Sequence, residues 1–556
     1  MKQALSALIG LVSLAALAAQ PGPVSPAEKK AAASITAEKI RGHVRFLASD
    51  LLEGRGPATR GDLLAQQYIA AQMEALGLAP GAPDGGWFQP VALVGITPEV
   101  PETMTYAAGE KELELKYRED FIAISGVQKP QARVEDAEVV FVGYGIVAPE
   151  YDWDDFKDMD VKGKVLLIMN NDPEDDPNLF AGKTRLWYGR WDYKYEMAGK
   201  KGAAAAIIIH TVPSAGYPWQ VVQTSWSGES FELPEEGTPR VQIKGWATDD
   251  ASKKIAALGG QDLDRLRAAA RKRDFRPVPL GVRLSFALEN RVQRKESANV
   301  IGKLAGSDPA LKNQAIVYTA HHDHLGVKEG AKPGEDKIYN GALDNASGVA
   351  AMLAIARAFT VLPRAPRRTV SFAAVAAEEQ GLLGSQYLAA HPPFPPGRIA
   401  ANINIDGVNI WGRTRDLTMV GLGKSNLDRT ILALARMQGR VVKPDQFPDR
   451  GFFYRSDQFY LAKVGVPAAY FDAGTDFRGK PAGWGKEQLE EWEKTHYHQP
   501  SDQLRDDWDL SGAVEDMQLL FHLGVQVANA DAMPHWNPGD EFEAARKKAL
   551  AELEGR

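Results

Sequence analysis

The feature that most constrains the fold is the alternation of apolar runs and helical patterns after Ser297. The apolar runs are short and continuous, which is typical of strands buried on both faces of a sheet. They occupy residues 315–320, 369–375, 399–405, 417–421 and 466–471. Helical patterns lie between or after them, at residues 345–359, 384–390, 426–437 and 511–529. This order predicts an α/β fold with a mostly parallel central sheet covered by helices on both faces.

Acidic and histidine side chains follow the predicted strands. The carboxyl ends of parallel strands meet at one edge of a sheet, where α/β proteins bind their ligands. The residues expected there are His321, His322, Asp323, His324, Asp344, Glu378, Glu379, Asp406 and His498. Each has an ordinary explanation alone, as a helix cap, a solvated loop residue, a turn residue or a surface histidine. Together they predict a metal site, and because the chain has no cysteine, its ligands are oxygen and nitrogen atoms.

A hydrolytic centre with two metal ions requires this combination of groups. Two metals about 3.5–4 Å apart hold a water molecule and a carbonyl oxygen. One carboxylate bridges the metals, a histidine and a carboxylate complete each side, and a further carboxylate takes the proton of the water. The adjacent Glu378 and Glu379 offer one base and one ligand. Asp323 follows two residues after His321 and is expected to accept the ring N–H of that histidine.

The length of 556 residues predicts more than one domain. Mixed short strands and helices over residues 135–290 indicate a small separate domain inserted into a larger one. Residues 36–134 are then the N-terminal part of the catalytic domain, and residues 291–535 are its main part. The Pro- and Ala-rich residues 21–35 are predicted to be a linker, and residues 536–556 a charged, solvated helix.

Tryptophan and tyrosine are concentrated in residues 184–226. Two interpretations stay open for this segment: it lines a substrate cleft, or it is a loop packed on its own aromatic rings. His210 ends a predicted strand with no carboxylate beside it, which favours a packed histidine over a metal ligand.

The N-terminal residues indicate where the protein is located, and its net charge indicates which partners are excluded. Residues 1–20 resemble a signal peptide, since Lys2 precedes an apolar run that ends in Ala16-Leu17-Ala18. We therefore expect export to the periplasm or the extracellular space. No later run approaches about 18 apolar residues, so no membrane contact is expected after signal removal. The net charge of −7 is spread along the chain, which argues against a nucleic-acid partner. The sequence does not indicate an oligomeric state.

Five motifs carry a resemblance to a known family. They are the segments 320–326 (AHHDHLG), 340–348 (NGALDNASG), 376–385 (AAEEQGLLGS), 404–407 (NIDG) and 497–502 (YHQPSD). With them the sequence resembles the M28 zinc peptidases of the secreted aminopeptidase type, with a protease-associated domain inserted at residues 135–290. The resemblance spans roughly residues 40 to 530. It implies a zinc-peptidase fold, peptide substrates and two Zn²⁺ ions per chain.

The resemblance also implies a role for each site residue. The implied zinc ligands are His321 and Asp406 for one ion, Glu379 and His498 for the other, and Asp344 as the bridge. Glu378 is the implied general base, Asp323 supports His321, and Tyr497 steadies the oxyanion.

The sequence also departs from the family pattern. Leu343 stands where an acidic residue often precedes the bridging aspartate. His322 and His324 are interpreted as structural residues, with His324 at the rim of the site.

Several alternatives to an exported dizinc aminopeptidase remain open. A glutaminyl cyclase of the same fold uses one zinc, and the presence of His321, Asp344 and His498 argues against it. A carboxypeptidase or dipeptidase requires an arginine for the substrate carboxylate. Arg450, Arg455 and Arg478 lie in predicted loops before His498 and keep this alternative open. A receptor-like binding protein on this fold would lack ligands that this chain retains.

Overall fold

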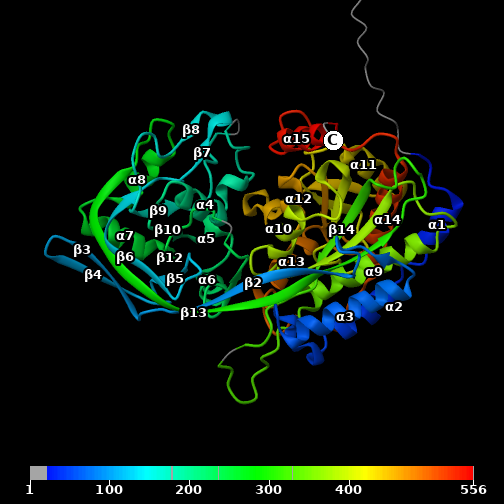
Figure 1. The fold of residues 1–556 in the computed structure, drawn as a ribbon, viewed down its shortest axis with the longest axis horizontal. Helices are drawn as coiled ribbons and strands as arrows, with labels where there is room; N and C mark the ends of the chain where they lie inside the picture. Colours follow the sequence, from blue (N-terminus) through cyan, green and yellow to red (C-terminus); the bar gives the residue numbers. More distant parts are fainter. Residues whose placement is uncertain (1–21, 177–178, 236, 329, 555–556) are drawn as a thin grey trace, which may run out of the picture.

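The computed structural model describes residues 22–176, 179–235, 237–328 and 330–554. The predicted signal peptide, residues 1–20, lies outside the described residues. The described chain forms two neighbouring parts, each around its own hydrophobic core (Figure 1). No helix among the described residues is both long enough and apolar enough to cross a membrane.

The first part contains the predicted parallel sheet. Its central strand β14 (Ala315–His321) pairs in parallel with β15 (Thr369–Val375) on one side and β16 (Ile399–Asn404) on the other. Strand β16 also pairs in parallel with β19 (Ala468–Asp472), which pairs antiparallel with β17 (Asp416–Val420). A short strand, β18 (Val441–Pro444), is parallel to β17. The predicted mostly parallel sheet of an α/β fold is thereby confirmed.

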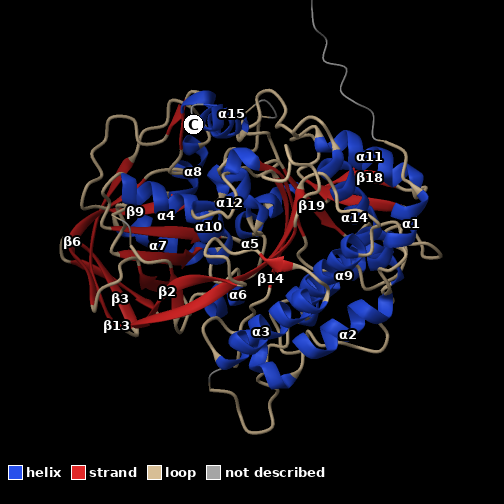
Figure 2. Ribbon diagram, turned by 45° about the vertical axis from the view of Figure 1, so that its right-hand side comes forward, coloured by secondary structure: helices blue, strands red, loops and turns tan. Residues whose placement is uncertain are grey.

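Helices cover both faces of this sheet (Figure 2). The helices of this part are α2 (Ala37–Leu47), α3 (Arg60–Ala75), α9 (Gly348–Thr360), α10 (Leu383–Ala390), α11 (Leu427–Met437), α12 (Gln458–Lys463), α13 (Trp484–Thr495) and α14 (Ser511–Asn529). Alternate side chains of β14 point to opposite faces, as the pleat of a strand requires. Ile316 and Tyr318 join the core that holds α9 and α14, whereas Val317 joins the core that holds Leu388 of α10 and Leu461 of α12.

The second part has a separate core that runs from Met104 to Leu288. Its main strands are β3 (Thr103–Ala108), β4 (Lys111–Lys116), β5 (Phe121–Ser125), β6 (Gln131–Phe141), β9 (Val165–Met169), β10 (Ala205–His210) and β12 (Ile243–Thr248). Its main helices are α4 (Trp191–Lys200), α7 (Asp249–Leu258) and α8 (Leu263–Ala270). This core begins before residue 135, where the sequence placed the boundary, because side chains of β3, β4 and β5 pack into it.

Two long strands connect the two parts. Strand β13 (Val278–Leu304) pairs antiparallel with β6 in the second part and with β15 in the first. Strand β2 (Phe88–Glu99) runs beside it, paired with residues 289–300. The boundary expected at residue 290 therefore falls inside a continuous strand, because apolar alternation does not reveal where one strand passes between two cores.

Both ends of the described chain pack against the first part: a helix replaces part of the expected linker, and the expected C-terminal helix forms but is only partly solvated. Residues 26–32, expected in a linker, form helix α1 (Pro26–Ala32), which is capped by Ser25 and buries Ala31 and Ala32. The C-terminal segment, expected to be solvated, includes α15 (Glu543–Glu554) and buries Trp536 and Phe542. These contacts join residues far apart in the sequence, which composition alone does not predict.

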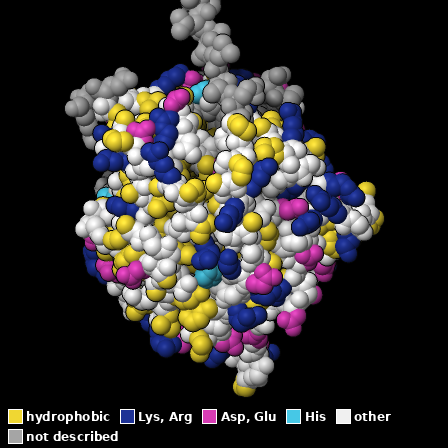
Figure 3. Space-filling view, turned by 90° about the vertical axis from the view of Figure 1, so that its right-hand side faces the viewer, with side chains coloured by type: hydrophobic (Ala, Val, Ile, Leu, Met, Phe, Trp, Pro, Cys, Tyr) yellow, Lys and Arg dark blue, Asp and Glu magenta, His cyan; other side chains and the backbone are white. Residues whose placement is uncertain are grey.

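Charges on the face shown in Figure 3 are mixed, with basic and acidic side chains interspersed rather than gathered in one field. Some buried arginines are held by backbone oxygens. Arg546 of α15, for example, donates to the carbonyls of Pro396 and Ile399 at 3.1 and 3.0 Å.

Candidate metal centre

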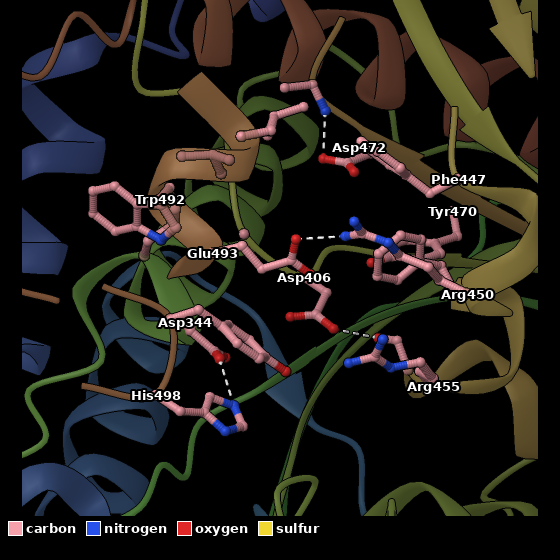
Figure 4. A pocket seen from close by; sticks show the side chains of 18 of the residues that line it. Asp344, Asp406, Phe447, Arg450, Arg455, Tyr470, Asp472, Trp492, Glu493 and His498 are labelled. Atoms are coloured by element: carbon pink, nitrogen blue, oxygen red, sulfur yellow. Dashed lines mark hydrogen bonds and ion pairs between the residues drawn. The ribbon is translucent and has the colours of Figure 1, made fainter. Parts of the chain in front are cut away.

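The structure brings the five predicted ligands together at the carboxyl edge of the parallel strands. His321 is the last residue of β14, Glu379 follows β15, and Asp406 follows β16. Asp344 comes from the turn before α9, and His498 from the loop after α13 (Figure 4). The five residues come from five separate segments, and three of them lie at or just after the ends of neighbouring parallel strands.

Asp344 sits with each of its carboxylate oxygens facing a different histidine. Its Oδ1 lies 3.3 Å from Nε2 of His321, and its Oδ2 lies 3.3 Å from Nε2 of His498. The same His321 nitrogen is 3.3 Å from Oδ1 of Asp406, and the same His498 nitrogen is 3.1 Å from Oε2 of Glu379. The arrangement is thus two His–carboxylate pairs that share Asp344 between them.

The donor set fits two cations. Burial alone raises the pKa of the Asp344 carboxyl, but contacts with His321 and His498 outweigh burial and hold that pKa well below its usual range. Both ring nitrogens of His498 are buried and make no hydrogen bond, although two carboxylate oxygens face Nε2. Buried polar atoms are normally paired, so imidazole and carboxylate lone pairs aimed at common points indicate positive ions between them.

Glu378 lies at the same edge of the sheet, but its carboxylate belongs to neither of the two His–carboxylate pairs. No hydrogen bond or ion pair joins its carboxylate to another residue in the described part of the chain, and it lines the cavities on both sides of the centre. Burial, against the opposing charge of His321, raises the pKa of the Glu378 carboxyl well above its usual value. A carboxyl with a raised pKa beside the reacting position is suited to accept and return a proton.

Asp323 supports the centre differently from the sequence expectation. Its carboxylate accepts the backbone N–H groups of Glu378 at 3.0 Å and of Glu379 at 3.3 Å. The hydrogen bond of His321 Nδ1 goes to the backbone oxygen of Asp323 at 3.2 Å, while the Asp323 carboxylate lies 3.7 Å away. Asp323 therefore fixes both glutamates as well as the ring of His321. The residue before them, Ala377, has a φ of 53°, a strained conformation for a side chain with a Cβ.

The comparisons with known proteins agree with this geometry. The model of Peptidase family M28 matches residues 299–522, which contain every residue of the centre. Residues 299–522 belong to peptidase family M28. The expected family is thereby confirmed for this segment, called the M28 segment below.

Curated relatives match over short stretches. A "Probable zinc metalloprotease" of Pyrenophora tritici-repentis is 48% identical over 68 residues, which are 12% of this chain and 15% of the relative. "Aminopeptidase NAALADL1" of Mus musculus is 31% identical over 133 residues, 23% of this chain and 16% of the relative. The matched regions thus span about a sixth or less of these two proteins.

A solved structure shares the fold over nearly the whole chain. The "Aminopeptidase from Aneurinibacillus sp. strain AM-1" superposes with a TM-score of 0.51 at 22% identity. The superposition covers 92% of this chain and 97% of that one. At this identity the likeness establishes the fold, including the part outside the M28 segment.

Two residues outside the expected set hold the M28 segment's ligand loops. Asp344 does not cap a helix, because residues 342–347 form a π-helical turn and α9 begins only at Gly348. The N–H groups of Leu343 and Asp344 that this turn leaves free donate to the carboxylate of Asp502 at 2.9 and 3.1 Å. Asp502 stands in the sequence motif at residues 497–502, which was the available signal for its importance.

Arg55 is the second residue that the sequence did not reveal. It is completely buried, and its guanidinium donates to the carbonyls of Leu47, His322, Asn340 and Gly341. Burial lowers the pKa of Arg55 to about 10. One side chain thus ties the histidine cluster after β14 to the loop before Asp344. No motif marks such a residue, since its partners are backbone oxygens.

The two extra histidines are both buried. His322 Nε2 donates to the carboxylate oxygen Oδ1 of Asp62, 2.9 Å away, as expected for a structural residue. His324 is not at the rim: it is fully buried, with Nδ1 2.6 Å from Glu379 Oε1. Donor atoms of His324, Asp344 and Glu379 also lie within 4.8 Å of one another. We assign the ligand role to His498, because His498 pairs with both Asp344 and Glu379 and lines both cavities. His324 pairs with Glu379 alone and lines neither cavity.

Two cavities flank the centre, one on each side of Glu378. The first, of about 210 Å³, is lined by the M28 segment alone, and Figure 4 labels Phe447, Arg450, Tyr470 and Trp492 among its walls. The second, of about 230 Å³, has the inserted part as its opposite wall. We call them the first cavity and the interface cavity. Tyr497 lines both, with its ring stacked on His498 at 3.9 Å between centroids.

The aromatic segment is divided: some of its rings pack on one another, and others line a cavity next to the centre. Trp187, Tyr188 and Tyr193 pack on one another and on neighbouring rings. Trp191 and Trp226 instead line the interface cavity. His210 is packed as expected, with Nε2 3.1 Å from the backbone oxygen of Tyr217.

The three arginines noted in the sequence have different surroundings. Arg450 pairs with Glu493 in the first cavity (Figure 4). Arg478 faces Glu515 at 3.8 Å and lines neither cavity. Arg455 lines both cavities.

Proposed function

We propose that this chain is an exported metallo-aminopeptidase that holds two zinc ions and releases N-terminal residues from peptides. The observation that carries the proposal is the geometry of Asp344, whose two oxygens each face the Nε2 atom of a different histidine at 3.3 Å. A bridging carboxylate with one His–carboxylate pair on each side is the ligand set of a two-metal hydrolase.

The proposed ligands follow from these contacts. His321 and Asp406 hold one ion, Glu379 and His498 hold the other, and Asp344 contacts both. When bound, the zinc ions act as Lewis acids on the scissile carbonyl and make water more acidic. The absence of cysteine leaves oxygen and nitrogen donors, which is consistent with a catalytic rather than a structural zinc site.

Glu378 performs the proton transfers in this proposal. It has no competing hydrogen-bond partner among the described residues, and its raised pKa allows it to keep a proton until the amine leaves. Its carboxylate accepts a proton from the attacking water and delivers that proton to the departing nitrogen. Asp323 holds the Glu378 backbone in place through the 3.0 Å hydrogen bond to its N–H.

Tyr497 is proposed to stabilise the negative charge that develops on the carbonyl oxygen. Its ring is fixed by stacking on His498, and it lines both cavities next to the centre. An O–H donor that is already in place loses no free energy to reorganisation during the reaction.

The preference for a free N-terminus is supported by two similar proteins that are named aminopeptidases, one from Mus musculus and one from Aneurinibacillus. It is also supported by Asp472, an acidic residue of the first cavity that has no ion pair among the described residues. A protonated α-amine is suited to such surroundings. Export is supported by the signal-like residues 1–20 alone.

The test combines metal analysis with a peptide panel. The purified chain is expected to carry close to two zinc ions and to cleave free-N-terminal peptides but not N-acetylated ones. A chelator should abolish this cleavage, and added zinc should restore it. Cleavage of N-acetylated peptides alone would contradict the aminopeptidase proposal, and one zinc per chain would contradict the bridging role of Asp344.

A further inference from the structure

The interface cavity has a wall that the reaction at the metal centre does not require. On one side it is lined by Glu378, Glu379, Tyr497 and His498, and on the other by the inserted part. The residues of the inserted part that form the wall include Arg190, Trp191, Tyr217, Trp226 and Phe231. Half-buried aromatic rings and a guanidinium therefore face the catalytic glutamates across about 230 Å³.

Arginine side chains gather at this wall with few acceptors. Arg190 is 7% exposed, and its Nε makes no hydrogen bond, with Asp192 Oδ1 at 3.5 Å. Arg185, behind it, is 3% exposed, and its Nε and Nη2 have no hydrogen-bond partner. Arg455 comes from the M28 segment; its side chain contacts Tyr497, and no ion pair joins it to a carboxylate in the described part of the chain. Guanidinium groups are rarely buried without a carboxylate or phosphate to accept their hydrogen bonds.

The guanidinium groups of Arg185, Arg190 and Arg455 are close enough to repel one another electrostatically. Burial lowers the pKa of Arg190, Asp192 raises it, and the charge of Arg455 lowers it further. The acidic residue Glu232 on the same wall is already paired with Arg240 and Lys244. A carboxylate ligand would therefore meet unpaired donors here and would reduce the repulsion among the arginines.

The two cavities differ in their charged residues. Arg455 lines both cavities. The first cavity adds an Arg450–Glu493 pair and Asp472, which has no ion pair among the described residues. The interface cavity instead adds Arg190, with Asp192 Oδ1 at 3.5 Å. Glu378 lies between them and lines both. A short peptide has an ammonium group on the N-terminal side of the scissile bond and a carboxylate on the C-terminal side. Its polarity matches a pose with the leaving residue in the interface cavity.

We infer that the interface cavity is the subsite for the leaving residue, and that Arg190 and Arg455 bind a carboxylate carried by that residue. This inference rests on the proposed peptidase function. It makes the chain selective for dipeptides and other short peptides, whose α-carboxylate reaches the arginines, or for an acidic residue after the scissile bond. Trp191 and Trp226 contact the apolar part of the same residue.

The test compares kcat/KM on three substrates: Leu-Ala, Leu-Ala amide and Leu-Glu amide. The unmodified chain is expected to prefer Leu-Ala over its amide by about tenfold or more, as for a hydrogen-bonded charge pair. A preference for Leu-Glu amide over Leu-Ala amide would identify the side-chain carboxylate as the ligand. Equal rates on all three substrates would overturn the inference, and no cleavage of any would instead contradict the proposed function.

Variants locate the preference. Arg190→Met and, separately, Arg455→Met should lose about tenfold more kcat/KM on the preferred substrate than on Leu-Ala amide, mainly through KM. Arg190→Lys retains the charge and should lose less than Arg190→Met, which separates charge from packing. The control is Arg271→Met, an arginine of the inserted part that pairs with Asp175 at 2.8 Å away from this cavity. It should keep the unmodified ratio, and equal losses on acid and amide in both Met variants would overturn the inference.

Discussion

The molecule has two parallel-strand edges, and they handle buried charge in opposite ways. At the edge of β14, β15 and β16, imidazole and carboxylate groups converge, and the nearby buried Arg55 donates its hydrogen bonds to backbone carbonyls rather than to these carboxylates. At the edge of β6 and β9 in the inserted part, Asp155 and Asp172 are also buried, but Lys194 of α4 lies with them. Its Nζ donates to the carbonyls of Tyr144 and Asn171 at 2.7 and 2.8 Å.

The difference shows why topology alone does not make a catalytic site. Both edges place acidic residues where parallel strands end, the usual ligand position of α/β sheets. The inserted edge supplies its own cation, and its aspartates also accept backbone N–H groups of Ile146 and Leu186. The carboxylates of the M28 edge have histidines rather than a lysine or arginine as their ion-pair partners, which is consistent with the zinc ions proposed above. The following predictions test this contrast, from the largest expected effect to the smallest.

Glu378→Gln is expected to reduce kcat by about 100- to 10,000-fold, because the amide cannot accept the proton of the water. Zinc content should remain near two ions per chain, since Glu378 is not among the proposed ligands. Peptide turnover and metal analysis on the same preparation check both parts. Substantial remaining activity would show that another group is the base.

Lys194→Met is expected to lower the free energy of unfolding by about 3–5 kcal/mol, because it leaves Asp155 and Asp172 buried without a cation. Denaturant unfolding of the full chain measures the change. Lys200→Met is the matched control: it lies on the same helix, pairs with Glu196 at the surface, and should change stability by about 0.5 kcal/mol or less. Similar stability of the two variants would show that Lys194 does not neutralise this edge.

Metal removal should destabilise only the M28 edge. At free zinc about 100 times its dissociation constant, binding contributes about 2.7 kcal/mol to the folded state. A chelator should therefore lower Tm in the unmodified chain and in Lys194→Met by similar amounts, because the two edges are independent. Thermal unfolding with and without chelator measures this, and an unchanged Tm would argue against bound metal.

Asp502→Asn is expected to weaken zinc binding by about 10- to 100-fold, the usual effect of losing a group that orients a metal ligand. The new amide donor would face one of the two N–H groups that Asp502 now accepts. Competition with a chelating dye gives the affinity. The exposed Asp506→Asn is the control and should bind zinc as the unmodified chain does.

Asp172→Asn should change the pH dependence of stability. Burial raises the pKa of Asp172 to about 7, above its unfolded value, so the folded chain binds a proton that the unfolded chain has lost between about pH 4 and 7. Stability from this group is present at low pH and falls as pH rises. Between pH 6 and 7, the free energy of unfolding of the variant should therefore fall by about 1 kcal/mol less than that of the unmodified chain, as measured by urea unfolding. The same slope in both proteins would exclude the titration of Asp172.

Much of the M28 edge was predictable because it depends on local patterns and one topological rule. The apolar runs marked the strands, and parallel strands necessarily gather the residues that follow them. That reasoning placed His321, Glu379 and Asp406 on neighbouring strand ends, as the structure does. It placed the start of the helix that follows Asp344 at residue 345, whereas α9 begins at Gly348, because a π-helical turn has the same composition as the first turn of an α-helix.

What the sequence did not reveal depends on long-range or backbone contacts. Arg55 lies 267 residues before the His322 carbonyl to which it donates, and no periodicity records that bond. His324 was expected at the rim of the site, yet it is buried against Glu379. The packing of α1 and α15 likewise depends on surfaces that only the folded chain provides.

Strand β13 determines how rigidly the two walls of the interface cavity face each other. It is a continuous strand of 27 residues, and together with the antiparallel β2 it forms a hydrogen-bonded ribbon that connects the two hydrophobic cores. Domain closure ordinarily bends a few loop residues, but here it would twist a paired ribbon. The spacing between Trp226 and Glu378 is therefore set before a peptide arrives, so that binding orders little of the protein. We therefore expect the proposed peptide to bind in a preformed cavity rather than to induce closure of the two parts around it.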